Sequence, residues 1–277
     1  MIMKHAGHAI AVCLTIAGVL AAGPLAANSS LPPLSHDVAG AWRNYVRAAE
    51  QRIAGELAAA DKFLVLDFAP DALASRRTLT GGGLVIEPVK AVDGRGTTLT
   101  VPGAMVHHWR GAVLIPGTTL ADVLRTLQEG GVLGARQEDV LAARVLDRRG
   151  DTMRVSLKLR RTKFVTVVYD TEHAVRFTRH GPHRASSTST AVKIAELAAA
   201  LTPAEHEVAP GDDRGYLWRW QAYWRYEQVA GGVLAECESI SLSRDIPAMV
   251  RYLVRPMVER TARESLERTL ATLRRMQ

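Results

Sequence analysis

Hydrophobic and polar side chains alternate most regularly in the last quarter of the chain. The segment 216–229 has the period-two pattern of a β-strand. Four large aromatic side chains fall on one face of this strand: Trp218, Trp220, Trp224 and Tyr226. The glycines at 231 and 232 predict a tight hairpin turn, because glycine accepts the positive φ that such turns need.

Pairing Val229 with Gly232 sets small side chains opposite the aromatic ones. These small residues are Ala235, Cys237, Ser239 and Ser241. Large rings that face small side chains leave space between them. The pattern therefore predicts a cavity on this face of the sheet, and binding more than catalysis.

A long amphipathic helix is predicted directly after the hairpin. Asp245 is a suitable N-cap, and Pro247 fits the first turn, where no backbone donor is lost. Apolar and small residues then recur at steps of three and four: Ile246, Val250, Leu253, Met257, Thr261, Ser265, Thr269 and Leu273. The arginines of this segment lie mostly off the stripe. We expect the helix to cover the aromatic face of the sheet, and a helix on a solid core is the alternative.

The middle of the chain has the alternation typical of antiparallel strands. Strands are predicted at 84–89, 107–115, 140–146, 152–160, 164–177 and 186–196. A short helix starts at Thr118 or Thr119 and ends at the glycines 130–131. Consecutive strands without crossover helices favour an antiparallel sheet over a parallel one.

The N-terminal part carries a different pattern. Residues 35–60 have the spacing of an amphipathic helix, and the apolar run 63–68 predicts a buried strand. Together these elements predict an α+β fold, in which a curved antiparallel sheet wraps around a long C-terminal helix. The N-terminal helix is an addition to that fold. The two earlier helices either close one end of the sheet or pack outside it.

The first residues have the features of a secretory signal peptide. One lysine precedes an apolar run at 9–22, and small residues stand at 26–27. We therefore expect cleavage near residue 27 and a periplasmic or secreted protein; an uncleaved membrane anchor is the alternative. The predicted division is a signal peptide at 1–27, a helical extension at 28–80 and one large domain at 81–277.

Composition narrows the classes of partner and site. The 277 residues carry a formal net charge of +7, spread along the chain without a block of cations. An exported protein without a nucleic-acid motif is not expected to bind DNA or RNA, whereas an anionic membrane surface or lipid headgroup complements this charge. A generally basic surface explains it equally well. Cys237 is the only cysteine after residue 27, so an intramolecular disulfide is excluded in the mature chain.

Two stretches of sequence resemble the START and birch-allergen superfamily (SRPBCC), which has a helix-grip fold. The segment from 147 to 173 is similar to its central hairpins, and 236–247, running into the last helix, is similar to its closing strand. The resemblance covers about 84–277. It implies a hydrophobic cavity between sheet and helix, which the superfamily uses for lipids, sterols, quinones and polyketides. Carriers, cyclases and oxygenase subunits share the fold, so it selects no single function.

Glu236 and Glu238 are the first catalytic candidates, because residues two apart on a strand point to the same side. The predicted register places Arg225 opposite Glu236 and Tyr223 opposite Glu238, on the face away from the aromatic rings. Cross-strand ion pairing on the convex surface is therefore expected in place of acid–base chemistry.

His173 is the second candidate. It shares a face with Tyr169 and Val175, so we expect it to look into the cavity as a hydrogen-bonding group or a base; a structural histidine is the alternative. The rings of His107 and His108 should lie on opposite faces of their strand, which is poor geometry for one metal ion. The chain has no nucleophile elbow, P-loop or dinucleotide fingerprint, and we expect neither a cofactor nor a metal.

These patterns predict an exported protein that holds a hydrophobic small molecule, such as a lipid, a quinone or a sterol-like compound. The predicted binding residues are Trp109, Tyr169, His173, Trp218, Trp220, Trp224, Tyr226, Cys237, Ser239, Met249, Leu253 and Met257. Two alternatives stay open. One is a cofactor-free cyclase or hydrolase that uses the same cavity, with His173 and Tyr169 as the reactive candidates. The other is an envelope interaction protein with a filled core.

Overall fold

The computed structural model describes residues 30–130, 139–162, 166–246 and 248–275, and in the last helix it describes the side chains from Arg260 onward. The predicted signal peptide at 1–27 lies outside this range. Within the described part, no helix is both long enough and apolar enough to cross a lipid bilayer.

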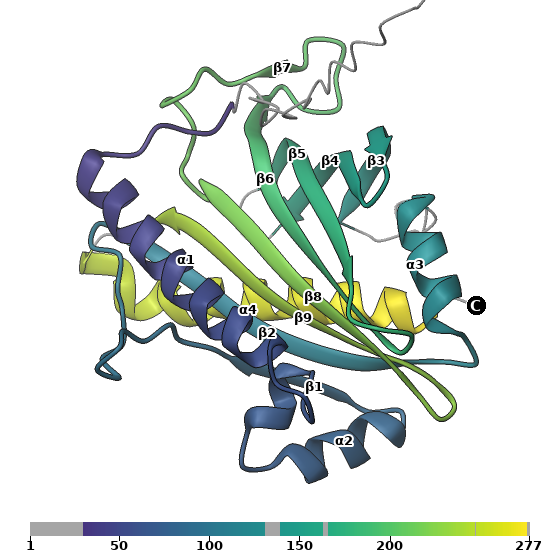
Figure 1. Cartoon of the computed structure of the whole chain (residues 1–277). Helices are drawn as coiled ribbons and strands as arrows, with labels where there is room; N and C mark the ends of the chain where they lie inside the picture. Colours follow the sequence, from purple (N-terminus) through teal and green to yellow (C-terminus); the bar gives the residue numbers. More distant parts are fainter. Residues whose placement is uncertain (1–29, 131–138, 163–165, 247, 276–277) are drawn as a thin grey trace, which may run out of the picture.

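Nine strands of the described chain form one antiparallel sheet (Figure 1). They are β1 (Leu84–Pro88), β2 (Ala104–Pro116), β3 (Val140–Arg149), β4 (Thr152–Thr162), β5 (Thr166–Arg179), β6 (Arg184–Ala198), β7 (His206–Glu207), β8 (Arg219–Val229) and β9 (Gly232–Arg244). Their order across the sheet is β1-β2-β9-β8-β6-β5-β4-β3, and the short β7 pairs with the side of β6. The predicted strands at 84–196 are therefore confirmed, most of them longer than the pattern indicated.

The β8–β9 hairpin has the register that the sequence predicts. Val229 pairs with Gly232, which places Tyr226 opposite Ala235 and Trp224 opposite Cys237. Gly231 turns the chain with a φ of 87°, a conformation in which most side chains are strained. The alternation of large and small residues is thus a real feature of one sheet face.

The last helix, α4 (Ala248–Arg274), lies along the concave face of the sheet. It comes closest at β2, where Gly111 has no side chain to hold it away. A Cβ at this position would stand 2.6 Å from Leu270 Cδ1 and 3.2 Å from Leu266 Cδ2. The predicted architecture, a curved antiparallel sheet wrapped around a C-terminal helix, is confirmed.

Helix α1 (His36–Leu57) covers the opposite, convex face of the sheet (Figure 1). Ser35 caps it by accepting a hydrogen bond from the Val38 N–H. Its buried residues, which include Trp42 and Tyr45, pack against Ile240 and other side chains of the outer sheet face. Of the two placements that the sequence left open for this helix, the structure has the outer one. The boundary predicted at residue 80 stays a prediction.

The segment that follows α1 differs from the prediction. In place of a strand at 63–68, the chain forms a 3₁₀ turn, η1 (Val65–Phe68), and then helix α2 (Ala72–Thr80). The reason is local, because the Asp67 carboxylate accepts the N–H groups of Phe63 and Leu64 at 3.1 and 2.9 Å and so bends the chain back. The apolar residues 63–66 are buried as expected, against the outer side of β2 and β9, whereas Phe68 is exposed.

Helix α3 (Leu120–Gln128) closes one end of the sheet. Thr119 caps it by accepting the Asp122 N–H at 3.2 Å, as the sequence predicts. Its apolar side, with Val123 and Leu124, packs into the same cluster as Phe177 and Leu273. The concave face is therefore bounded by the sheet, by α4 and by this helix.

Candidate ligand-binding cavity

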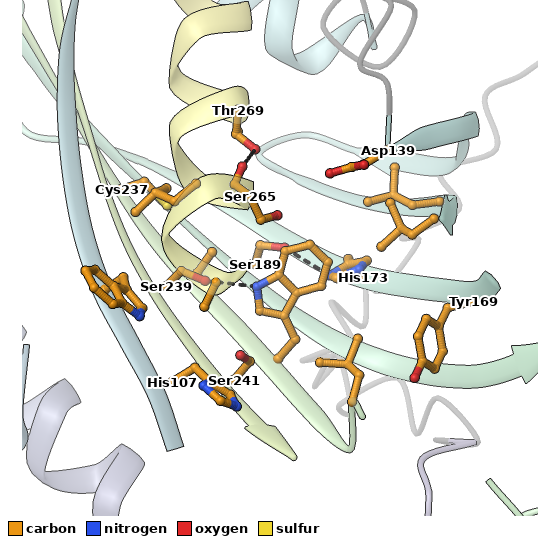
Figure 2. A pocket seen from close by; sticks show the side chains of 18 of the residues that line it. His107, Asp139, Tyr169, His173, Ser189, Cys237, Ser239, Ser241, Ser265 and Thr269 are labelled. Atoms are coloured by element: carbon orange, nitrogen blue, oxygen red, sulfur yellow. Dashed lines mark hydrogen bonds between the residues drawn. The ribbon is translucent and has the colours of Figure 1, made fainter. Parts of the chain in front are cut away.

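A cavity of about 710 Å³ lies between the concave face of the sheet and α4 (Figure 2). Its lining is mostly apolar. The apolar and aromatic lining residues of the sheet include Trp109, Met153, Val155, Leu157, Leu159, Val167, Val175, Phe177, Trp220, Ala222, Trp224 and Tyr226. This volume falls within the range of about 300–1,000 Å³ that is typical of small-molecule pockets.

The aromatic wall forms as the hairpin pattern predicts. Trp224 and Tyr226 stack with ring planes 1° apart and centroids 6.1 Å apart. The Trp220 indole N–H donates to Ser239 Oγ at 3.1 Å, so its polar atom is satisfied, and Trp220 lines the cavity. Cys237 lines the cavity opposite Trp224, and burial raises the pKa of its thiol well above the usual value. The small side chain of this cysteine therefore leaves room opposite Trp224, and the thiol is not a thiolate nucleophile at neutral pH.

His173 of β5 also lines the cavity, as predicted. Its Nε2 is 3.1 Å from Thr171 Oγ1 and its Nδ1 is 3.3 Å from Ser189 Oγ, and its ring meets Trp220 edge-on at 4.9 Å. Burial lowers the pKa of the imidazole to about 4. The ring is thus neutral at pH 7, so it acts there as a hydrogen-bonding group.

One corner of the cavity is charged, and sequence reasoning missed it. Asp139 Oδ2 stands 2.5 Å from an Nη of Arg268 on α4 and 3.4 Å from an Nη of Arg161 on β4. All three residues line the cavity, together with Tyr169. The sequence does contain the information that places both arginines. Arg161 lies on the same strand face as Leu157 and Leu159, which point inward, and Arg268 lies three residues after Ser265 and so on the same side of the helix.

The placement of Trp218 is a correction. It does not line the cavity; it packs with the cluster that α1 forms on the outer face, and its indole N–H donates to Asp213 at 3.2 Å. The alternation breaks here because β8 begins only at Arg219, after a turn at Gly215 with a φ of 78°. Arg244 lies over the Trp218 ring at 5.8 Å.

The helical stripe is described only in its second half. Thr261, Ser265, Thr269 and Leu273 line the cavity, as their spacing predicts. Met249, Leu253 and Met257, which the sequence also assigned to the ligand, lie outside the described side chains. The remaining predicted binding residues, Trp109, Tyr169 and Ser239 among them, are part of the lining.

Glu236 and Glu238 lie on the face away from the cavity and have the predicted cross-strand neighbours, Arg225 and Tyr223. The expectation of a surface ion pair is wrong, however. Both carboxylates are only 1% exposed, because α1 and η1 cover this part of the sheet. Arg225 instead pairs with Glu56 of α1 at 2.5 Å.

The covering segments supply the partners of these buried carboxylates. Glu236 accepts the backbone N–H groups of Val65 and Leu66 at 2.5 and 3.0 Å, and burial raises its pKa to about 7. Glu238 is bonded by Arg52 and, at 2.7 Å, by His108 Nε2. Burial opposes its ionisation, but these cationic and hydrogen-bonding partners prevail and lower the pKa to about 2. Through these contacts, Glu236 and Glu238 hold η1 and α1 against the sheet.

The two neighbouring histidines point to opposite faces, as predicted. His107 lines the cavity and lies 2.9 Å from Ser243 Oγ, whereas His108 meets Tyr45 and Glu238 under α1. Among the described residues, no group of three or more His, Cys, Asp or Glu side chains is arranged to hold a metal ion.

Comparison with solved structures finds proteins with similar architecture. The STAR-related lipid transfer protein of Xanthomonas axonopodis is 18% identical with a TM-score of 0.43, over 64% of this chain and 96% of that one. The lipid transfer and protein localization domain of human StarD13 is 13% identical with a TM-score of 0.40, over 74% and 93%. The di-domain ARO/CYC StfQ from the steffimycin biosynthetic pathway is 9% identical with a TM-score of 0.39, over 61% and 50%.

No protein-family model matches the chain, and no curated protein does. START-related proteins are among the structures found, as the sequence resemblance led us to expect. We identify the fold from this chain's own curved sheet and from the helix along its concave face. The fold is a helix-grip fold. With TM-scores below 0.5, the likenesses say nothing about the ligand of this helix-grip protein.

Proposed function

We propose that the protein binds a hydrophobic small molecule, such as a lipid, a quinone or a sterol-like compound, between the sheet and α4. The observation that carries this proposal is the apolar cavity of about 710 Å³ with an aromatic wall. Protein interiors are normally packed with few voids larger than a water molecule. A space of this size in the middle of a sheet–helix interface is therefore suited to an occupant.

The chemistry of the lining supports an apolar ligand. Burial of apolar surface contributes roughly 25 cal/mol per Å² before the costs of association. Trp109, Trp220 and Trp224 offer rigid rings that lose little conformational entropy on binding.

A cofactor-free cyclase or hydrolase is the second candidate. The observation in its favour is that His173 lies in the cavity wall. General bases work best with a pKa near the operating pH, and the pKa of His173 is lowered to about 4 by burial. The ring is thus a weak proton acceptor, so we favour binding over catalysis. An interaction protein with a filled core is disfavoured by the cavity itself.

Export and membrane contact are further proposals, which rest on the sequence. The apolar run at 9–22 followed by small residues supports cleavage near residue 27. The excess of arginine supports contact with an anionic membrane. N-terminal sequencing of the protein from the cell envelope tests the first, and a start at residue 1 would contradict cleavage.

A pair of substitutions on neighbouring strands tests ligand binding. Ala222→Phe on β8 places a ring between Trp220 and Trp224 inside the cavity, whereas Thr188 of β6 is exposed, so that Thr188→Phe adds the same ring outside. The probe is N-phenyl-1-naphthylamine, a neutral apolar fluorophore. We expect the wild type and Thr188→Phe to bind it alike and Ala222→Phe to bind it at least about tenfold more weakly, since the ring occupies ligand volume. Absence of binding to the wild type, or equal binding by all three, contradicts the proposal.

A further inference from the structure

Two polar groups of the cavity lining have no partner within the described part of the chain, and one of them lies at the charged corner. Tyr169 is 2% exposed, and within the described part of the chain its hydroxyl has no hydrogen-bond partner. In the same part, the buried Nε of Arg268 also has none. Buried polar atoms are normally paired, so those left over in a cavity are available to a ligand atom or a water molecule.

Both residues line the cavity on the concave face, where Arg161 and Arg268 meet at one corner. Leu159 and Tyr169 are direct cross-strand partners of β4 and β5, and Arg161 follows two residues after Leu159 on the same face. Arg268 reaches this corner from α4, since it shares the Asp139 carboxylate with Arg161. Figure 2 shows Asp139 and Tyr169 on the same side of the cavity, with the Tyr169 hydroxyl directed away from Asp139.

The charges of the three described side chains at this corner do not cancel. The guanidinium groups of Arg161 and Arg268 share the single carboxylate of Asp139, so these three side chains carry one positive charge in excess. Both guanidinium groups also contact the same oxygen, Oδ2 of Asp139. Guanidinium N–H groups match the oxygens of carboxylates and phosphates, and charge-assisted hydrogen bonds are about twice as strong as neutral ones.

We propose that this corner binds the anionic head group of an amphipathic ligand, whose hydrocarbon part lies along the tryptophan wall. The head group is a carboxylate or a phosphate monoester, held by Arg161 and Arg268. A cavity of about 710 Å³ favours a ligand with a single chain. This inference rests on the proposed function and names the chemical class of the ligand.

The test compares ligands that share a twelve-carbon chain and differ only at the head. Dodecanoate, dodecyl phosphate and dodecan-1-ol are titrated into the delipidated full chain below their micellar concentrations, with calorimetric detection. We expect at least one of the two anions to bind about tenfold or more tightly than the alcohol. Whichever anion has the greater affinity identifies the head group.

Variants separate recognition of the anion from general packing. Arg161→Gln leaves Asp139 paired with Arg268 and should lower the anion-to-alcohol preference about tenfold, with alcohol binding unchanged. Asp139→Asn removes the competing carboxylate and should raise the preference, which loss of structure alone would not do.

Two results would overturn the inference, and they are distinguishable. If the alcohol binds as tightly as both anions and no variant alters the ratio, the corner does not select a head group, although the proposed function stands. If neither the anions nor the alcohol binds, and the neutral probe does not bind either, the proposed function fails with it.

Discussion

Two buried tyrosines differ in what surrounds their hydroxyl groups. Tyr45 of α1 is 3% exposed, lies 2.9 Å from His108 Nδ1 and accepts the Ala91 N–H at 3.2 Å. Tyr169 of β5 is buried to the same degree but has no hydrogen-bond partner among the described residues. A buried hydroxyl with hydrogen-bond partners stabilises the folded state, whereas a buried hydroxyl without them destabilises it.

Removal of each hydroxyl should therefore have different consequences for stability. We expect Tyr45→Phe to lower the free energy of unfolding by about 1–3 kcal/mol, because it leaves a buried N–H and an imidazole nitrogen unpaired. In Tyr169→Phe the free energy of unfolding should stay within about 1 kcal/mol of the wild type or rise. Urea denaturation of delipidated protein measures both. An equal loss in the two variants would show that the Tyr169 hydroxyl has a partner in the folded chain.

At the scale of elements, the sequence predicted what depends on local pattern. The β8–β9 hairpin and α4 follow from alternation, glycine placement and helical spacing. The turn at η1 escaped prediction because Asp67, a single residue within an apolar run, redirects the chain. The burial of Glu236 and Glu238 escaped it because the covering helix comes from a segment about 180 residues earlier. The pattern of polar and apolar residues along one strand does not indicate which segment of the chain packs against that strand.

The contact between α1 and β9 should give stability a particular pH dependence. The Arg52 and His108 partners lower the pKa of Glu238 from about 4.5 to about 2. A carboxyl group whose pKa is lower in the folded state stabilises the fold above its unfolded pKa, and this contribution disappears as the pH falls toward the folded value. The Glu238 contribution is therefore present above about pH 5, on the order of 3 kcal/mol, and is lost between about pH 5 and pH 2.

Glu238→Gln tests this coupling. We expect the wild type to lose more stability than the variant when unfolding is measured from pH 5.5 down to pH 2.5, since the variant has no carboxylate to protonate. The comparison also cancels the opposite contribution of Glu236, whose raised pKa removes stability as the pH rises from about 4.5 to about 7. Glu207→Gln at an exposed site is the control. Parallel pH profiles for the wild type and Glu238→Gln would contradict the assignment.

At the scale of the whole molecule, the sheet has two covered faces with different contents. The convex face is packed by α1 and η1 and holds ionised and hydrogen-bonded groups that tie these segments down. The concave face is spanned by α4 but leaves a cavity with an aromatic wall and a charged corner. The candidate catalytic carboxylates are on the first face and the space for a ligand is on the second. This separation favours a binding protein over an enzyme that uses those carboxylates.

The most direct measurement is native mass spectrometry of the freshly purified protein, followed by organic extraction and identification of what is released. We predict a mass above that of the polypeptide, which extraction removes and which is absent or much reduced in Ala222→Phe but retained in Thr188→Phe. Titration of the extracted protein with lipids should then change its tryptophan fluorescence, because Trp109, Trp220 and Trp224 line the cavity. A protein that purifies without a bound molecule and shows no fluorescence change with any lipid would contradict the central claim.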